Sequence, residues 1–195
     1  MSRKSATDKV QNTSRRAAFH HGDTRRAATE AALGLLAREG REALTLRAVA
    51  ELIGVNHRAL YRHFASLDVL KAEVATAGFG RLAAALERVS AGDPRALARA
   101  YARFAFAEPA LYDLMFALPL RRLYGEPVGD AGPLGSAVRR VTSAAIAAVG
   151  SRDTKMRVFR LWGLAHGLIG LYRTGAWRAR TDRQAIAFIA SLTNA

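Results

Sequence analysis

The side chains best suited to recognising another molecule lie in residues 44–64, where the sequence predicts two short helices joined by a tight turn. In the second helix, His57, Arg58, Tyr61 and Arg62 fall on the outward side. An arginine can bind a guanine through two hydrogen bonds, and a tyrosine hydroxyl can bond to a phosphate. We therefore expect this helix to enter the DNA major groove with its first residues toward the base edges. A helical hairpin with a solvated outer face is the alternative that spacing alone leaves open.

The turn between these helices has the residues that a helix-turn-helix requires. Gly54 can adopt a positive φ and end the first helix, and Asn56 is a preferred N-cap for the second. Leu60 and Phe64 are four residues apart, so both face inward from the second helix. The pattern predicts a helix-turn-helix whose second helix is held by its apolar side.

Residues 19–74 as a whole resemble the N-terminal DNA-binding domain of the TetR family of transcriptional regulators. The resemblance is carried by LTLRAVAELIGV, which is similar to the first part of the family's motif, and by ALYRHFASLDVL, which contains its Leu-Tyr-x-x-Phe signature. It implies DNA contacts at Thr45, Arg47, Asn56, His57, Tyr61, His63 and Lys71, to which the outward position of Arg58 adds an eighth.

Two positions depart from the family's pattern. His57 stands where a lysine is frequent, and Arg58 stands where a small residue is common. The operator sequence therefore cannot be carried over from relatives.

The composition limits the classes of function that remain. The 195-residue chain has a net charge of +14 and no cysteine, which excludes disulfides, thiol catalysis and cysteine-based zinc sites. Residues 1–71 hold 13 basic and 7 acidic residues, and the remainder holds 17 and 9, so the positive excess is spread along the whole chain. The charge supports an anionic partner, but the motif is the stronger indication.

We find no nucleophile motif, phosphate-binding loop or recognisable carboxylate pair, so we expect neither catalysis nor a cofactor. His20 and His21 are adjacent and lack a third ligand, so we expect no metal site. The longest apolar stretch, residues 158–172, is interrupted by Arg160 and His166, so we expect no membrane span and a cytoplasmic protein.

The chain is predicted to be all-α, with about nine helices in two domains. Residues 1–18 form a basic, disordered tail that either follows DNA or stays solvated, residues 19–74 form the helix-turn-helix domain, and residues 75–195 form a helical effector-binding and dimerisation domain. Caps, glycines and prolines predict helices that cover approximately residues 23–38, 46–53, 57–64, 67–89, 94–107, 109–117, 134–150, 152–173 and 182–193. A proline- and glycine-rich loop follows residue 117 and extends to Pro133.

The helix over residues 152–173 is apolar nearly all round, and it must be covered on every side. We expect it to pair with its copy, together with the helix over residues 182–193, as a four-helix bundle in a homodimer. In such a dimer, the second helix of each helix-turn-helix contacts one operator half-site. The two half-sites then lie about 34–36 Å apart, or a multiple of that distance.

RFAFAEPALYDLMF and LWGLAHGLIGLY resemble the C-terminal domain of a TetR subgroup named for a Trp-His-Gly pattern, here Trp162, His166 and Gly167. The resemblance implies a domain that senses an effector and dimerises. Six side chains are candidates for an apolar cavity with a few polar groups: Tyr101, Phe104, Leu111, Met115, Trp162 and His166. The alternative is that this aromatic and methionine stripe is plain core.

Three functions follow from these observations. The leading prediction is a homodimeric repressor that a small-molecule effector releases from its double-stranded DNA operator. A basic protein that coats DNA without sequence preference is the second. An enzyme that uses His166 with Glu108 or Asp113 is the third, and only the residue types favour it.

Overall fold

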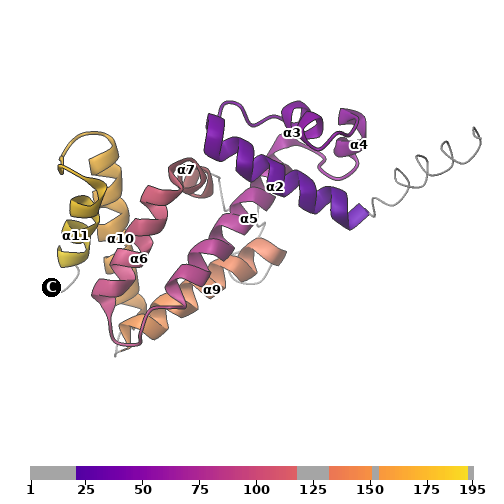
Figure 1. The fold of residues 1–195 in the computed structure, drawn as a ribbon. Coiled ribbons are helices and arrows are strands. Elements are labelled where there is room, and N and C mark those ends of the chain that lie inside the picture. Colours follow the sequence, from indigo (N-terminus) through magenta and orange to yellow (C-terminus); the bar gives the residue numbers. More distant parts are fainter. Residues whose placement is uncertain (1–20, 118–131, 151–153, 193–195) are drawn as a thin grey trace, which may run out of the picture. The chain divides into compact units, whose positions relative to one another are not determined.

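The computed structural model describes residues 21–117, 132–150 and 154–192. All regular structure in these ranges is helical, and no strand occurs in them, as the sequence predicts (Figure 1). The chain divides into two compact units after Leu70. The predicted tail over residues 1–18, with His20, and most of the proline-rich loop lie outside the described residues.

From residue 21 onward, the first unit contains three helices and the start of a fourth: α2 (His21–Glu39), α3 (Leu46–Leu52), α4 (His57–Tyr61) and α5 (Leu67–Leu86) (Figure 1). Helix α3 packs against both α2 and α4. These helices bury one continuous set of apolar side chains: Ala28, Ala32, Leu35, Leu36, Leu44, Leu46, Val49, Ala50, Leu60, Phe64 and Leu70. The helix periodicity of the sequence predicts this core because each helix has one apolar stripe.

The predicted N-caps begin the three helices that follow α2. Thr45 Oγ1 accepts a hydrogen bond from the Ala48 amide at 3.1 Å, and Asn56 Oδ1 accepts one from the Arg58 amide at 2.9 Å. Ser66 Oγ accepts from Val69 at 3.3 Å. These bonds satisfy amides that have no partner within their own helix.

Several predicted helix ends are wrong by two or three residues. Helix α2 already includes His21, two residues before the predicted start at residue 23, and α5 ends at Leu86, three residues short of residue 89. Helix α4 ends at Tyr61, because the His63 amide bonds to the Leu60 carbonyl at 2.9 Å and tightens the last turn. Phe64 therefore lies beyond the helix, yet its side chain is completely buried.

The described part of the second unit holds the rest of α5 and five more helices: α6 (Pro94–Ala107), α7 (Pro109–Ala117), α9 (Gly132–Val149), α10 (Thr154–Arg173) and α11 (Asp182–Ser191). Helix α6 packs against the other four of these five. The bounds of α6 and α7 agree with the prediction, because each begins with a proline at a first helical position. None of the described helices combines the length and apolar composition that a membrane-spanning segment requires.

Helix α5 approaches α7 closely at Gly78. A Cβ atom on Gly78 would lie 2.6 Å from Met115 Sδ and 3.0 Å from a methyl group of Leu111, so a larger residue would fit only if these side chains shifted. Arg81 of α5 adds an ion pair with Glu108 at 2.6 Å. Met115 and Leu111 are therefore packing residues of the contact between α5 and α7.

A set of aromatic rings joins α11 to α10. The Trp177 ring lies 5.1 Å from that of Tyr172 and 5.0 Å from that of Phe188, and its indole N–H donates to the Leu168 carbonyl at 2.9 Å. Aromatic pairs at these separations stabilise a contact beyond the area they bury. They fix the chain reversal between the two helices.

Thr181 and Gln184 have the spacing of a capping box, so the sequence predicts one at the start of α11, and the structure forms only part of it. Thr181 Oγ1 accepts from the Gln184 amide at 3.2 Å, as expected. The Gln184 side chain, however, accepts from the Arg180 amide at 3.1 Å and not from that of Thr181.

We expect Gly54→Ala to lower the free energy of unfolding by about 1 kcal/mol, since residue 54 has φ = +69°, a conformation that disfavours a side chain. No atom outside the local chain lies within 4 Å of the added Cβ, so the cost is conformational. Urea denaturation measures the change.

The matched control is Gly34→Ala in α2, where the backbone is helical and only the flexible tip of Arg38 is near. There alanine should raise the free energy of unfolding by about 0.5–1 kcal/mol. Equal changes at both positions would contradict the role of φ at Gly54.

Candidate functional site

The first unit exposes most of the predicted DNA-contacting side chains. Thr45, Arg47, Asn56, His57, Arg58 and Tyr61 are exposed, and His63 and Lys71 are partly exposed. Lys71 lies on α5, one residue beyond the end of the first unit. Leu60 is the inward residue of α4 and is fully buried. The exposed residues of α4 therefore lie together on its outward side. Contact with DNA stays a prediction for all eight.

Thr45 and Asn56 cap their helices and remain able to donate hydrogen bonds from their side chains. In each residue the side-chain oxygen already accepts a bond from its own helix. The Thr45 hydroxyl hydrogen and the Asn56 amide hydrogens remain as donors. Donors suit phosphate oxygens, which only accept hydrogen bonds.

Arg25 of α2 positions the end of α4 and was missed by the sequence analysis. Its guanidinium donates to the His63 carbonyl at 2.9 Å and lies 5.0 Å from the centre of the Phe64 ring. It thereby fixes the residues directly after Tyr61. No local signal identifies such a residue, because its partners are 38 and 39 positions away in the sequence.

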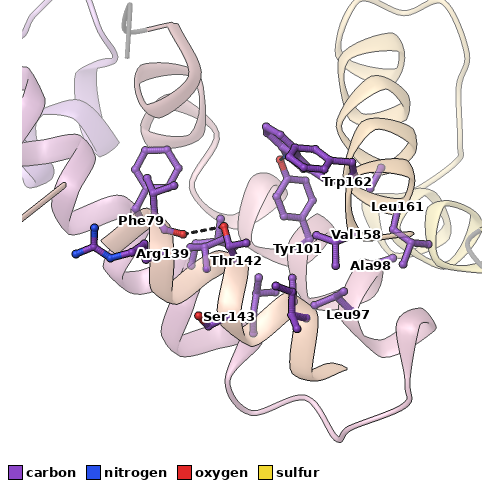
Figure 2. Close-up of a pocket in the computed structure, with 18 of the residues that line it drawn as sticks. Phe79, Leu97, Ala98, Tyr101, Arg139, Thr142, Ser143, Val158, Leu161 and Trp162 are labelled. Carbon is purple, nitrogen blue, oxygen red and sulfur yellow. Dashed lines mark hydrogen bonds between the residues drawn. The ribbon is translucent and has the colours of Figure 1, made fainter. Parts of the chain in front are cut away.

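The second unit contains a cavity of about 640 Å³ between α5, α6, α7, α9 and α10 (Figure 2). Its volume is in the range of small-molecule sites, and its lining is mainly apolar. Tyr101 and Trp162 line it, whereas the other four candidates do not: Phe104, Leu111, Met115 and His166. Leu111 and Met115 are instead buried against Gly78, and Phe104 is buried on α6.

Much of the cavity wall comes from helices to which the sequence analysis assigned no effector contact. Helix α5 contributes Phe79, Leu82 and Leu86, and α9 contributes residues between Val138 and Ile146. In the sequence, these side chains have the pattern of ordinary helix core. Only the way the helices pack shows that they border a space.

Trp162, Tyr101, Tyr112 and His166 form a chain of hydrogen bonds beside this cavity. The Trp162 indole N–H donates to the Tyr101 hydroxyl at 2.9 Å, and the two tyrosine oxygens are 3.1 Å apart. His166 Nδ1 lies 2.5 Å from the Tyr112 hydroxyl and 3.0 Å from that of Tyr101. One arrangement uses the indole proton and both hydroxyl protons: Trp162 donates to Tyr101, Tyr101 to Tyr112, and Tyr112 to Nδ1 of a neutral His166.

Burial favours the uncharged form of each titratable group in this chain of hydrogen bonds. Desolvation raises the pKa of Tyr101 to about 12, and it also raises the pKa of Tyr112. Desolvation lowers the pKa of His166 below its usual value. The cluster is therefore neutral at pH 7.

The described residues contain no group of three acidic, histidine or cysteine side chains that could hold a metal ion.

Comparison with known proteins identifies the family. Residues 28–74 match the model of the tetR family of bacterial regulatory proteins, and residues 95–192, about half of the chain, match the tetracyclin repressor-like C-terminal domain. The chain belongs to the TetR family and is a DNA-binding transcriptional regulator.

Individual relatives agree with this assignment. The chain is 29% identical over 162 residues to an uncharacterised HTH-type transcriptional regulator of Mycobacterium tuberculosis, a match that covers 78% of this chain and 71% of that protein. A protein of unknown function from Rhodococcus sp. RHA1 has a TM-score of 0.68 at 26% identity, over 91% of this chain and 96% of its own. The TetR family regulator PfmR from Thermus thermophilus shares the fold, with a TM-score of 0.56 at 20% identity over 85% and 96% of the two chains.

We expect acidification to destabilise the native protein more than its His166→Asn variant. The folded-state pKa of His166 is lowered, so the unfolded chain takes up the proton first. The stability is lost as the pH falls below about 6.5, the value in an unfolded chain. Asparagine keeps an acceptor near the position of Nδ1 but does not titrate in this range.

Urea denaturation at several pH values between about 8 and 5 measures the two slopes. The expected result is a smaller loss of unfolding free energy in the variant below about pH 6.5. Parallel curves would show that His166 is not held neutral by its surroundings.

Proposed function

We propose that the chain is a homodimeric repressor that reads an operator with α4 and leaves it when a small molecule binds in the second unit. The observation that carries the proposal is the outward row of α4. His57, Arg58 and Tyr61 are exposed on a helix whose inner residue, Leu60, is completely buried. A short helix held in this way has the geometry that insertion into a major groove requires.

The eight predicted DNA-contacting residues have different proposed roles. Arg58 contacts a base edge from the first turn of α4, and Tyr61 contacts a phosphate through its hydroxyl. Thr45 and Asn56 donate to phosphates with the hydrogens that their caps leave available. Arg47, His57, His63 and Lys71 complete the proposed DNA contacts.

We expect Arg58→Ala to weaken preference at one base position of the operator by about 1–3 kcal/mol, because it removes a base contact. Tyr61→Phe is the matched variant on the same helix, and it should weaken binding to all sequences together, because it removes a phosphate contact. Footprinting on the upstream region of the protein's own gene locates the operator, and titration of single-base variants against unrelated competitor DNA measures both effects. A uniform loss for Arg58→Ala would remove it from base reading.

The proposed dimer forms through α10 and α11, which expose large apolar side chains: Met156, Phe159, Trp162, Leu164, Leu171, Phe188 and Leu192. Met156 is 58% and Phe159 61% exposed. Gly163, Gly167 and Gly170 follow the same side of α10, and no atom lies within 4 Å of where their Cβ atoms would be. An apolar stripe lined with glycines permits close approach of a second helix.

We expect Gly167→Leu to raise the dimer dissociation constant at least about tenfold, or ~1.4 kcal/mol. The new side chain meets no atom of its own chain, so each subunit should still fold. Gly80→Leu on α5 is the matched control, since its Cβ position is also open. Sedimentation equilibrium measures both, and an unchanged constant for Gly167→Leu would place the interface elsewhere.

The Trp-His-Gly resemblance gains support from the roles of the three residues. Trp162 and His166 belong to the same hydrogen-bonded chain, one turn apart on α10. Gly167 lies on the open side proposed for dimerisation. We therefore propose that the second unit belongs to this subgroup.

The proposed effector contacts are narrower than the six candidates of the sequence. Tyr101 and Trp162 line the cavity, and of the other four only His166 bonds to one of them, through the Tyr101 hydroxyl. Helix α5 carries three lining residues and also contains Leu67–Leu70 of the first unit. An effector that prefers one position of α5 would therefore change operator affinity.

The two other functions have less support. Glu108 is paired with Arg81 and Asp113 with Arg173, so neither carboxylate is available as a partner for His166. A protein that coats DNA would use the positive net charge of +14, but it does not need a capped helix with a buried inner residue and an exposed outer row. We propose that the regulator acts without catalysis or cofactor in the bacterial cytoplasm, where its DNA lies.

A further inference from the structure

The charged residues that line the cavity all have the same sign. Arg139 and Lys155 are the charged residues among those that border it, and no described lining residue is acidic. Most of the others are aliphatic or aromatic side chains. A ligand in this cavity therefore meets an apolar interior and a positive border.

The acidic residues described in the second unit are engaged elsewhere. Glu87 pairs with Arg140 at 2.8 Å, Glu108 with Arg81, and Asp113 with Arg173. Asp93 caps α6, and Asp182 accepts from the Tyr172 hydroxyl at 3.1 Å. The sixth, Glu73, lies on α5 and is not a lining residue.

The polar groups of the interior are largely occupied by one another. The Trp162 N–H donates to the Tyr101 hydroxyl, which also bonds to Tyr112. The Thr142 hydroxyl donates to the Val138 carbonyl at 3.1 Å. These groups offer a ligand little further hydrogen bonding, so the strongest unused polar attraction lies at the positive border.

Lys155 is the side chain best placed to supply that attraction. It is exposed at the start of α10 and forms no ion pair with any residue that the structure describes. Arg139 donates to Ser136 Oγ at 2.9 Å, and its guanidinium points away from Tyr101 and Trp162 (Figure 2). An anion at the border therefore finds Lys155 as its first partner.

We propose that the effector is an amphipathic anion, a hydrocarbon or aromatic body with one acidic head group that Lys155 binds. The inference rests on the proposed effector site and specifies its ligand class. When the hydrocarbon or aromatic body enters the cavity, its apolar surface is removed from water. The acidic head group stays at the border of the cavity, where it pairs with a positive side chain. A cationic head would be desolvated beside like charges, and none of the described lining residues has a carboxylate that could pair with it, which is unfavourable.

Three probes of equal chain length separate the contribution of the body from that of the head: decanoate, decanol and decylamine. Isothermal titration of the full-length protein below the micelle concentration should show decanoate binding about tenfold more tightly than decanol, and decylamine binding most weakly. The advantage of decanoate over decanol should shrink as salt is added, because the head lies at the exposed border.

Two variants assign the effect to one side chain. Lys155→Gln should remove most of the advantage of decanoate and leave the affinity for decanol unchanged. Arg160→Gln is the matched control, because Arg160 is also an exposed cation of α10 but does not line the cavity. Equal losses in both variants would show that the net charge of the chain, and not a head-group site, attracts the anion.

The outcomes separate the inference from the proposed function. Decanol and decanoate binding equally, or decylamine binding most tightly, would overturn the anionic ligand class but keep the cavity as an effector site. Binding of none of the three, with the protein folded by circular dichroism, would overturn the effector site itself. Val141→Trp, which places a large ring in the cavity, should abolish the binding of all three probes.

Discussion

The burial of Leu60 and Phe64 is the contact on which the DNA-reading geometry depends. Helix α4 has five residues, and a helix of that length is not stable by itself in water. Its orientation comes from two completely buried side chains, from the Asn56 cap and from the contacts of Arg25 with His63 and Phe64. The outward residues of α4 are thus presented by a rigid core, and a regulator can tell one sequence from another only if that presentation is fixed.

The second unit solves a different problem, which is to keep a space open inside an apolar packing of helices. Close packing at Gly78 brings α7 against α5, and the chain from Trp162 through Tyr101 and Tyr112 to His166 links α10, α6 and α7. Buried polar groups are tolerated here because each finds a partner. The cavity lies beside these contacts, so a ligand that alters them also alters the helices that they join.

The sequence predicted the bounds of the helices more closely than it predicted which residues line the cavity. Helices α6 and α7 agree with their predicted bounds, because Pro94 and Pro109 can occupy only the first turn of a helix. Of the six candidate effector residues, Tyr101 and Trp162 line the cavity. The residue types of the six candidates could not show which of them line the cavity and which belong to the core. An apolar side chain at a cavity and one in close packing follow the same helical periodicity.

The amino-acid sequence by itself determined the class of fold, the caps of the helices, the family and the outward residues of α4, because these depend on neighbours within a few positions. Tertiary structure decided what depends on distant partners: the support of α4 by Arg25, the walls that α5 and α9 give to the cavity, and the uncovered side of α10. The physical reason is that periodicity fixes which side of a helix is apolar. It does not fix whether that side meets another helix, a cavity or a second subunit.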